Sequence, residues 1–194
     1  MQPANGFAFK EWAVICAALG SGRQSLIVRK GGIGEGREGF RVEHPEFFLF
    51  PTYVHQIEPS QLTPDGQLLL GEVLAHRPPP DSIELAHYAV VEQVFDVRDE
   101  TRLPCLEGLH LWSHHTLGDR FHYRQPGLFI LAVRIYRLPA AVRIPDSPHF
   151  AGCRTWVDLP AEISTAGAEP VLSEAAFNRQ LNAIQLALES PGFA

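Results

Sequence analysis

The chain has 194 residues, of which 45 % are hydrophobic and 20 % are charged, and its formal net charge is −6. This length can bury one sizeable core, or two small lobes that share an interface. The composition excludes wholesale disorder. No run of about 18 apolar residues is present, so we expect no membrane-spanning helix. The first residues lack a cationic segment followed by a long apolar one, so we expect no secretory signal.

The cysteines indicate a reducing compartment. Cys16, Cys105 and Cys153 are far apart, odd in number, and form no Cys-x-x-Cys pair. This spacing argues against a disulfide framework and against a four-cysteine zinc site. We therefore expect a cytoplasmic protein.

The segments before residue 80 predict two helices and two strands. The spacing of Trp12, Ile15 and Leu19 predicts a helix over residues 9–22, which ends near Gly20. Two stretches rich in residues that favour β-structure predict strands over residues 24–30 and 46–56. A third stretch, residues 63–77, starts with turn residues and predicts a short helix.

After the proline run Pro78–Pro80, which is the best candidate hinge, the chain continues with both kinds of element. Strands are predicted over 82–97, 127–138 and 152–159, and helical structure over 107–123. A final helix is predicted over 173–189, where Ser173 is placed to cap it. Because strands and helices do not alternate regularly, the order favours an α+β fold. We expect a curved mixed or antiparallel sheet, or a small barrel-like core, with flanking helices.

A glycine-rich loop follows the strand at 24–30. Gly34–Gly39 formally matches G-x-G-x-x-G, but no helix follows it, so a dinucleotide site is excluded. No G-K-[ST] is present, which excludes a Walker loop. Arg29 and Lys30, with the backbone amides of Gly31 and Gly32, could instead form an anion site. The alternative is a flexible hairpin whose cations are solvated.

Nine histidines raise the question of a metal or a general base. His110 and His114 are four residues apart, but the segment lacks the internal glutamate of a metalloprotease helix, so we predict no metal and no other cofactor. His55 lies in an aromatic setting where burial would shift its pKa and suit a general base. The alternative is a half-buried histidine with ordinary hydrogen bonds.

Residues 120–157 contain six arginines and one acidic residue, whereas residues 81–107 contain seven acidic residues and two arginines. Arginines interleaved with aromatic residues, such as Arg120, Tyr123 and Arg134, are typical of surfaces that bind nucleic acid. In a strand, however, neighbouring side chains point to opposite faces. The alternative is a sheet with polar edges that pairs with the acidic segment.

Two blocks, "KEWAVICAALGSGRQSLIVRKGGI" and "FRVEHPEFFLFPTYVHQ", resemble the family catalogued as domain of unknown function 1802. "RFHYRQPGLFILAVRIYRL" and "GCRTWVDL" look like the distal part of the same family. The resemblance covers most of residues 9–159 and places Trp156 with the candidate binding residues. It implies a possible role beside restriction–modification or other DNA-handling systems, but no established activity. The stretch from Gly118 is also similar to RNA-binding barrels of the pseudouridine-synthase-associated kind, which favours a curved β core.

These observations lead to three hypotheses about function. The first is an accessory module that binds nucleic acid or another phosphate-bearing ligand, with a restriction-type nuclease as a possible partner. Its expected binding residues are Arg29, Lys30, Gly31, Gly32, Arg120, Tyr123, Arg134 and Trp156. The second is a phosphoester or nucleotide hydrolase with His55 as catalytic base and Glu43 or His44 as its partner. The third is a protein-interaction module or homodimer without activity.

We expect residues 1–160 to form one domain, or two lobes hinged at 78–80, followed by a linker and helix over 161–194.

Overall fold

The computed structural model describes residues 1–30, 42–53, 58–152 and 154–189. Three of the predicted site residues, Gly31, Gly32 and His55, lie outside these ranges. Most of the described strands form one path in the order β2-β5-β4-β3-β1-β6, and β7 pairs with β5 beside this path. The strands are β1 (Ala4–Trp12), β2 (Leu26–Arg29), β3 (Glu46–Thr52), β4 (Ser82–Val97), β5 (Leu128–Pro145), β6 (Trp156–Ser164) and β7 (Glu169–Pro170).

Helices lie between and after these strands. They are α1 (Ala13–Gly20), α2 (Pro64–Ala75), α3 (His114–His122) and α4 (Glu174–Glu189), with short 3₁₀ helices η1 (Pro59–Gln61), η2 (Glu100–Leu106) and η3 (Pro148–Phe150). The α+β class predicted from the order of elements is therefore confirmed. No helix in the described ranges is both long and apolar enough to cross a membrane.

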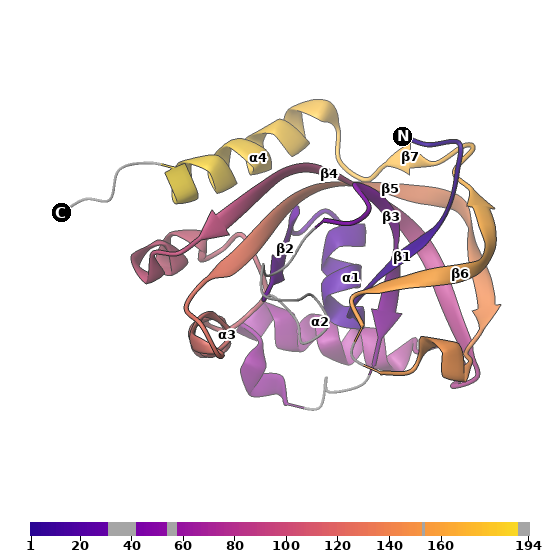
Figure 1. Ribbon diagram of the computed structural model, residues 1–194, viewed down its shortest axis with the longest axis horizontal. Helices are drawn as coiled ribbons and strands as arrows, with labels where there is room; N and C mark the ends of the chain where they lie inside the picture. The colour runs from indigo at the N-terminus through magenta and orange to yellow at the C-terminus, as the bar shows by residue number, and fades with distance from the viewer. Residues whose placement is uncertain (31–41, 54–57, 153, 190–194) are drawn as a thin grey trace.

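The sheet is mixed and strongly curved. β1 pairs with β3 in parallel, whereas the other strand pairs are antiparallel. Figure 1 shows the long strands β4 and β5 arching over α1, while α4 lies on the outer side of this arch. The curvature brings the end of β2 close to the end of β1, although three strands lie between them in the strand order. The predicted curved sheet is confirmed, and it remains open.

Two clusters of buried hydrophobic side chains lie in the fold. The larger contains the α1 residues Ile15 and Leu19, which pack with β2, β5 and Ile184 of α4. The smaller is built around Phe48 and Tyr88, with residues from β1, β5, β6 and η3. Because the apolar face of α4 joins the larger cluster, the C-terminal helix is part of the same core as the strands.

The C-terminal helix agrees with its sequence pattern. The hydroxyl of Ser173 accepts a hydrogen bond from the backbone N–H of Ala176 at 3.3 Å, as a capping residue does. Phe177 and Ile184, which lie on one face of this helix, are buried, and Leu181 and Leu188 pack against the core. The division of the chain at residue 160 stays a prediction.

The predicted helix over residues 9–22 is wrong in its first part. The chain is a strand through Trp12 and turns directly into α1 at Ala13. Phe9 and Glu11 lie in register with Leu49 and Pro51 of β3, so sheet pairing overrides the local helical spacing. This change puts Glu11 at a sheet end and beside a cavity.

The helix predicted over 107–123 is shorter than expected. It begins at His114, because the Ser113 hydroxyl accepts from the backbone N–H of Thr116 at 3.3 Å and caps it there. Just before this cap, Trp112 forms an isolated β-bridge with Leu62. The residues before Ser113 in this segment are therefore not helical: Trp112 lies in the core, and α3 starts after the cap.

Candidate ligand-binding site

A cavity of about 830 Å³ opens where the ends of several elements meet. Its lining comes from the ends of β1 and β3, from Arg29 of β2, from the segment between α2 and β4 with the start of β4, and from the segment between β5 and β6, which includes η3. Its charged and aromatic lining includes Lys10, Glu11, Trp12, Arg29, Tyr53 and Arg77. We call this space the Arg29 cavity.

An ion pair lies at the inner end of the Arg29 cavity. Arg29 Nη2 is 3.9 Å from Glu11 Oε2, and the Glu11 side chain is only 2 % exposed. The other carboxylate oxygen accepts from the backbone N–H of Trp12 at 2.7 Å. Arg29 Nη2 also donates to the carbonyl of Lys10. Within the described ranges, Glu11 Oε2 and Arg29 Nε have no hydrogen-bond partner. The pair therefore has one acceptor and one donor that no described residue satisfies.

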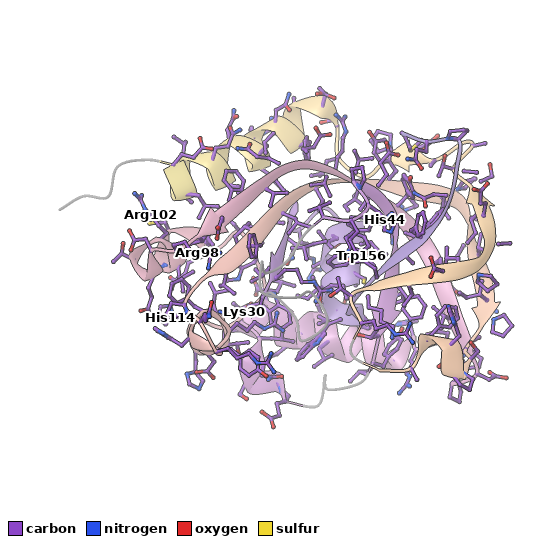
Figure 2. All side chains as sticks on the ribbon, viewed as in Figure 1. Lys30, His44, Arg98, Arg102, His114 and Trp156 are labelled. Carbon is purple, nitrogen blue, oxygen red and sulfur yellow. The ribbon has the colours of Figure 1, made fainter. Side chains whose placement is uncertain are left out.

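The Arg29 guanidinium also lies over an aromatic ring. Its carbon is 4.2 Å from the centroid of Phe9, and Phe9 packs edge-on against Trp156 at 4.9 Å. Trp156 contacts Phe47 and His44 as well. Figure 2 shows Trp156 and His44 beside β1 and β6. Trp156, a predicted binding residue, therefore supports Arg29 through Phe9.

The outer part of the Arg29 cavity carries two arginines without carboxylate partners among the described residues. Arg77 stands over the ring of Tyr53 at 4.6 Å, and Arg154 lines the cavity just before β6. Burial raises the pKa of Tyr53, so its hydroxyl stays protonated and can donate. Sequence reasoning missed Arg77 and Arg154, although Arg77 directly precedes the proline run that was singled out.

Acidic residues also line the Arg29 cavity, and two of the four have arginine partners. Glu11 pairs with Arg29, and Glu84 accepts from Arg143 at 3.0 Å. Asp81 and Asp146 lie at the exposed rim, where the two chain segments meet through a backbone hydrogen bond of 2.8 Å. An incoming anion would therefore meet these two aspartates as well as Arg77 and Arg154.

Arg120 lies close to this site in a separate hollow. Its guanidinium stacks on Trp112 at 3.7 Å and lies 5.7 Å from the ring of Trp12. Burial lowers the pKa of Arg120 to about 10. The Glu11 carboxylate opposes this shift, and the Arg29 guanidinium adds to it. The fold thus brings together Arg29 and Arg120, which are 91 residues apart in the sequence.

The other predicted cations have different surroundings. Lys30 donates to the carbonyls of Phe121, Gln125 and Gly127 and so holds the turn after α3. Figure 2 shows it on the α3 side of the molecule, away from Trp156. Arg134 donates to Glu174 of α4 at 2.5 Å. Of the predicted binding residues, Arg29 lines the first cavity, Arg120 and Tyr123 line the second hollow, and Trp156 contacts Phe9 behind Arg29 without lining the cavity.

The predicted base and its partners give no catalytic arrangement in the described part of the chain. His55 itself is outside the described ranges. His44 stacks on Phe7 with ring centroids 3.6 Å apart, and Glu43 is exposed. His110 is buried and accepts from the backbone N–H of Trp112 at 3.2 Å. Within the described ranges no three His, Cys, Asp or Glu side chains gather as metal ligands would.

The fold and site describe an α+β protein whose open, curved sheet carries a charged cavity at one end. The sequence matches the family model "Domain of unknown function (DUF1802)" over residues 8–183. The chain belongs to this family, as its sequence blocks predicted. No curated protein matches it.

Three crystal structures of ASCH from Zymomonas mobilis, two of them of single-residue mutants, are similar to the chain. They are 10, 11 and 12 % identical to it, with TM-scores of 0.44, 0.45 and 0.43. The alignments cover 91, 94 and 91 % of this chain and 93, 98 and 96 % of those chains. A similarity at this level says nothing about what this chain binds.

Proposed function

We propose that this protein is a non-catalytic module that binds nucleic acid or another phosphate-bearing ligand in the Arg29 cavity. The observation that carries the proposal is the convergence of three arginines on one space of about 830 Å³. Arg77 and Arg154 stand at its outer part without ion pairs to described residues, and Arg29 lies deeper. Guanidinium groups bind phosphate through paired, charge-assisted hydrogen bonds.

The aromatic side chains of the Arg29 cavity suit a nucleotide better than a simple anion. Trp12, Phe50 and Tyr53 line it, and nucleobases stack on such rings with little dependence on their identity. The hydroxyl of Tyr53 adds a donor or acceptor for a base or sugar. This mixture of phosphate-binding and base-stacking groups supports a single-stranded ligand, because unpaired bases expose their faces.

The other two hypotheses have less support. The hydrolase hypothesis depends on His55 as the base, and because His55 lies outside the described ranges this hypothesis stays a prediction. An interaction module would need a continuous apolar surface. The large hydrophobic side chains that are exposed in the described ranges, such as Leu68, Val94 and Leu186, come from different elements. A nuclease partner and a cytoplasmic location stay predictions.

Fluorescence anisotropy with labelled single-stranded RNA and DNA tests the proposal. The double variant R77Q/R154Q removes two positive charges from the cavity, and R23Q/R179Q removes two from exposed arginines elsewhere. We expect R77Q/R154Q to lower affinity about tenfold or more, and to reduce the slope of log K against log salt by roughly 1.4. The control variant should bind as the wild type does.

Two results would overturn the proposal. In the first, R77Q/R154Q binds with the affinity and salt dependence of R23Q/R179Q. In the second, neither RNA, DNA, nucleotides nor inorganic phosphate binds the wild-type protein at low salt. Circular dichroism of each variant establishes that it is folded before affinities are compared.

A further inference from the structure

Arg120 is a cation that the fold buries in part without giving it an acceptor. Among the residues that the structure describes, none accepts a hydrogen bond from Arg120 or forms an ion pair with it. Its charge is held instead by the face of Trp112, at 3.7 Å, and by Glu11 at longer range. A partly desolvated guanidinium with unused donors has a strong preference for an anion.

Arg120 lines a hollow of about 350 Å³ that lies outside the Arg29 cavity. Polar side chains of η1 and α3 line it, together with the exposed aromatic ring that follows α3. These residues are Ser60, Gln61, Thr116 and Tyr123. We call this space the Arg120 hollow.

Four other titratable side chains line the Arg120 hollow. Asp119 lies 3.3 Å from His115, so the two form an ion pair when the histidine is protonated. Glu58 is exposed to solvent. Tyr123 is 52 % exposed, and the Arg124 guanidinium lies over its ring, 5.2 Å from the centroid. The hollow therefore combines a guanidinium, hydroxyl groups and a partly exposed aromatic ring with two carboxylates, and the Arg29 cavity holds the same kinds of group.

Trp12 and Trp112 link the Arg29 cavity to the Arg120 hollow. Trp12 lines the Arg29 cavity, and its ring packs edge-on against Trp112 with centroids 4.8 Å apart. Arg120 lies over both rings. Glu11 influences both Arg29, its ion-pair partner, and Arg120. A ligand that crosses Trp12 could therefore place phosphates on both arginines.

We infer that the Arg120 hollow is a second phosphate-binding subsite, and that the ligand is a single-stranded oligonucleotide that reaches both spaces. This inference rests on the proposed function of the Arg29 cavity and specifies its ligand class. A mononucleotide would fill one space only. An oligonucleotide would place one phosphate near Arg29, Arg77 and Arg154, another on Arg120, and a base on Tyr123.

The length dependence of binding tests the inference on the wild-type protein. Labelled mono-, di- and tetranucleotides and oligomers of about eight nucleotides are compared at fixed salt. We expect affinity to rise at least about tenfold between the mononucleotide and the length that first reaches the second subsite. If the mononucleotide binds as tightly as the oligomers, the inference is wrong, although the proposed function stands.

Variants test the residue assignment. R120Q should lower oligonucleotide affinity toward the mononucleotide value and leave mononucleotide affinity unchanged, whereas R179Q, with the same charge change on α4, should have no effect. R120K keeps the charge without the planar fork and should fall between wild type and R120Q. Y123A, at an exposed position, should weaken oligomers alone and provides an answer if R120Q does not fold.

The outcomes separate the two proposals. If R120Q binds oligonucleotides as tightly as R179Q does, the second subsite is overturned. If R120Q does not fold, the same comparison is made with Y123A. Tighter binding of an acidic peptide than of any oligonucleotide, lost in R120Q, would assign the Arg120 hollow to a protein partner and overturn the inference.

Discussion

Arg29 of β2 and Glu11 of β1 form an ion pair of 3.9 Å between strands that are not neighbours in the sheet. β5, β4 and β3 lie between them in the strand order, so the contact exists only because the sheet curves round α1. Glu11 is 2 % exposed and Arg29 is 19 % exposed in their side chains. The pair therefore joins the two ends of the arch and also forms the inner wall of the Arg29 cavity.

Removing one partner of this pair should destabilise the fold more than removing both. R29M leaves the buried Glu11 carboxylate unpaired, so we expect a loss of about 3 kcal/mol in the free energy of unfolding. The double variant E11L/R29M replaces the pair with apolar side chains and should recover most of that loss. Urea denaturation of E11L, R29M and E11L/R29M, compared with wild type, measures the interaction energy. Strictly additive effects would show that the two side chains do not stabilise each other.

Lys30 should contribute to stability rather than to ligand affinity. Its ammonium group donates to the carbonyls of Phe121, Gln125 and Gly127, and burial, with the nearby Arg98 guanidinium, lowers its pKa. K30M removes these bonds, so we expect the free energy of unfolding to fall by about 1–3 kcal/mol. Oligonucleotide affinity, measured on the folded fraction, should not change.

One result would contradict this prediction for Lys30. If K30M melts as the wild type does but binds nucleic acid more weakly, the sequence-based prediction that Lys30 contacts phosphate would be correct. R23Q provides the control for loss of one positive charge.

The sequence predicted the class of fold because most strands and the last helix carry strong local patterns. β4 and α4 have the bounds that their spacing indicates, and Ser173 caps α4 as predicted. The strand at Ala4–Trp12 was missed because its identity depends on pairing with β3, which local spacing does not contain. Glu11 was missed as a site residue for the same reason.

The candidate site could be predicted only in part. Arg29 and Arg120 were identified from residue type, but their proximity depends on the curvature of the sheet and on the Trp12–Trp112 contact. Lys30 stands next to Arg29 in the sequence, yet its side chain turns toward α3 because strand neighbours point to opposite faces. Sequence neighbours were therefore separated, whereas distant residues were brought together.

His110 should make stability depend on pH. Its ring is 5 % exposed, and burial lowers the pKa of His110 from 6.5 to about 4. Between these values the unfolded chain binds more protons than the folded chain. The stability that this group contributes is thus complete above pH 6.5 and is lost as the pH falls toward 4.

The variant H110N tests this dependence. An asparagine oxygen can accept from the Trp112 N–H that now donates to Nδ1, but it does not titrate. We expect wild type to lose about 3 kcal/mol more than H110N between neutral pH and pH 4, at about 1.4 kcal/mol per pH unit. Urea denaturation across this range measures the difference. Parallel stability curves for the two proteins would mean that His110 is protonated as easily in the folded chain as in the unfolded chain.

Arg134 should matter for the docking of α4 and little for nucleic acid. Its guanidinium donates to Glu174 at 2.5 Å and lies 5.3 Å from the ring of Phe177. Hydrogen bonding to Glu174 is the main reason that the pKa of Arg134 is raised. Because Arg134 already pairs with Glu174 in the first turn of α4, it should bind a phosphate less strongly than Arg77 or Arg120.

We therefore expect R134Q to keep oligonucleotide affinity within about twofold of wild type, and to speed hydrogen exchange in the first turn of α4. E174Q removes the same contact from the other side and should give the same exchange pattern, because both variants release the start of the helix. Hydrogen-exchange mass spectrometry and anisotropy on the same samples separate the two effects. An R134Q variant that binds as weakly as R77Q/R154Q, with normal exchange in α4, would extend the binding surface across β5 as its arginine-rich sequence predicted.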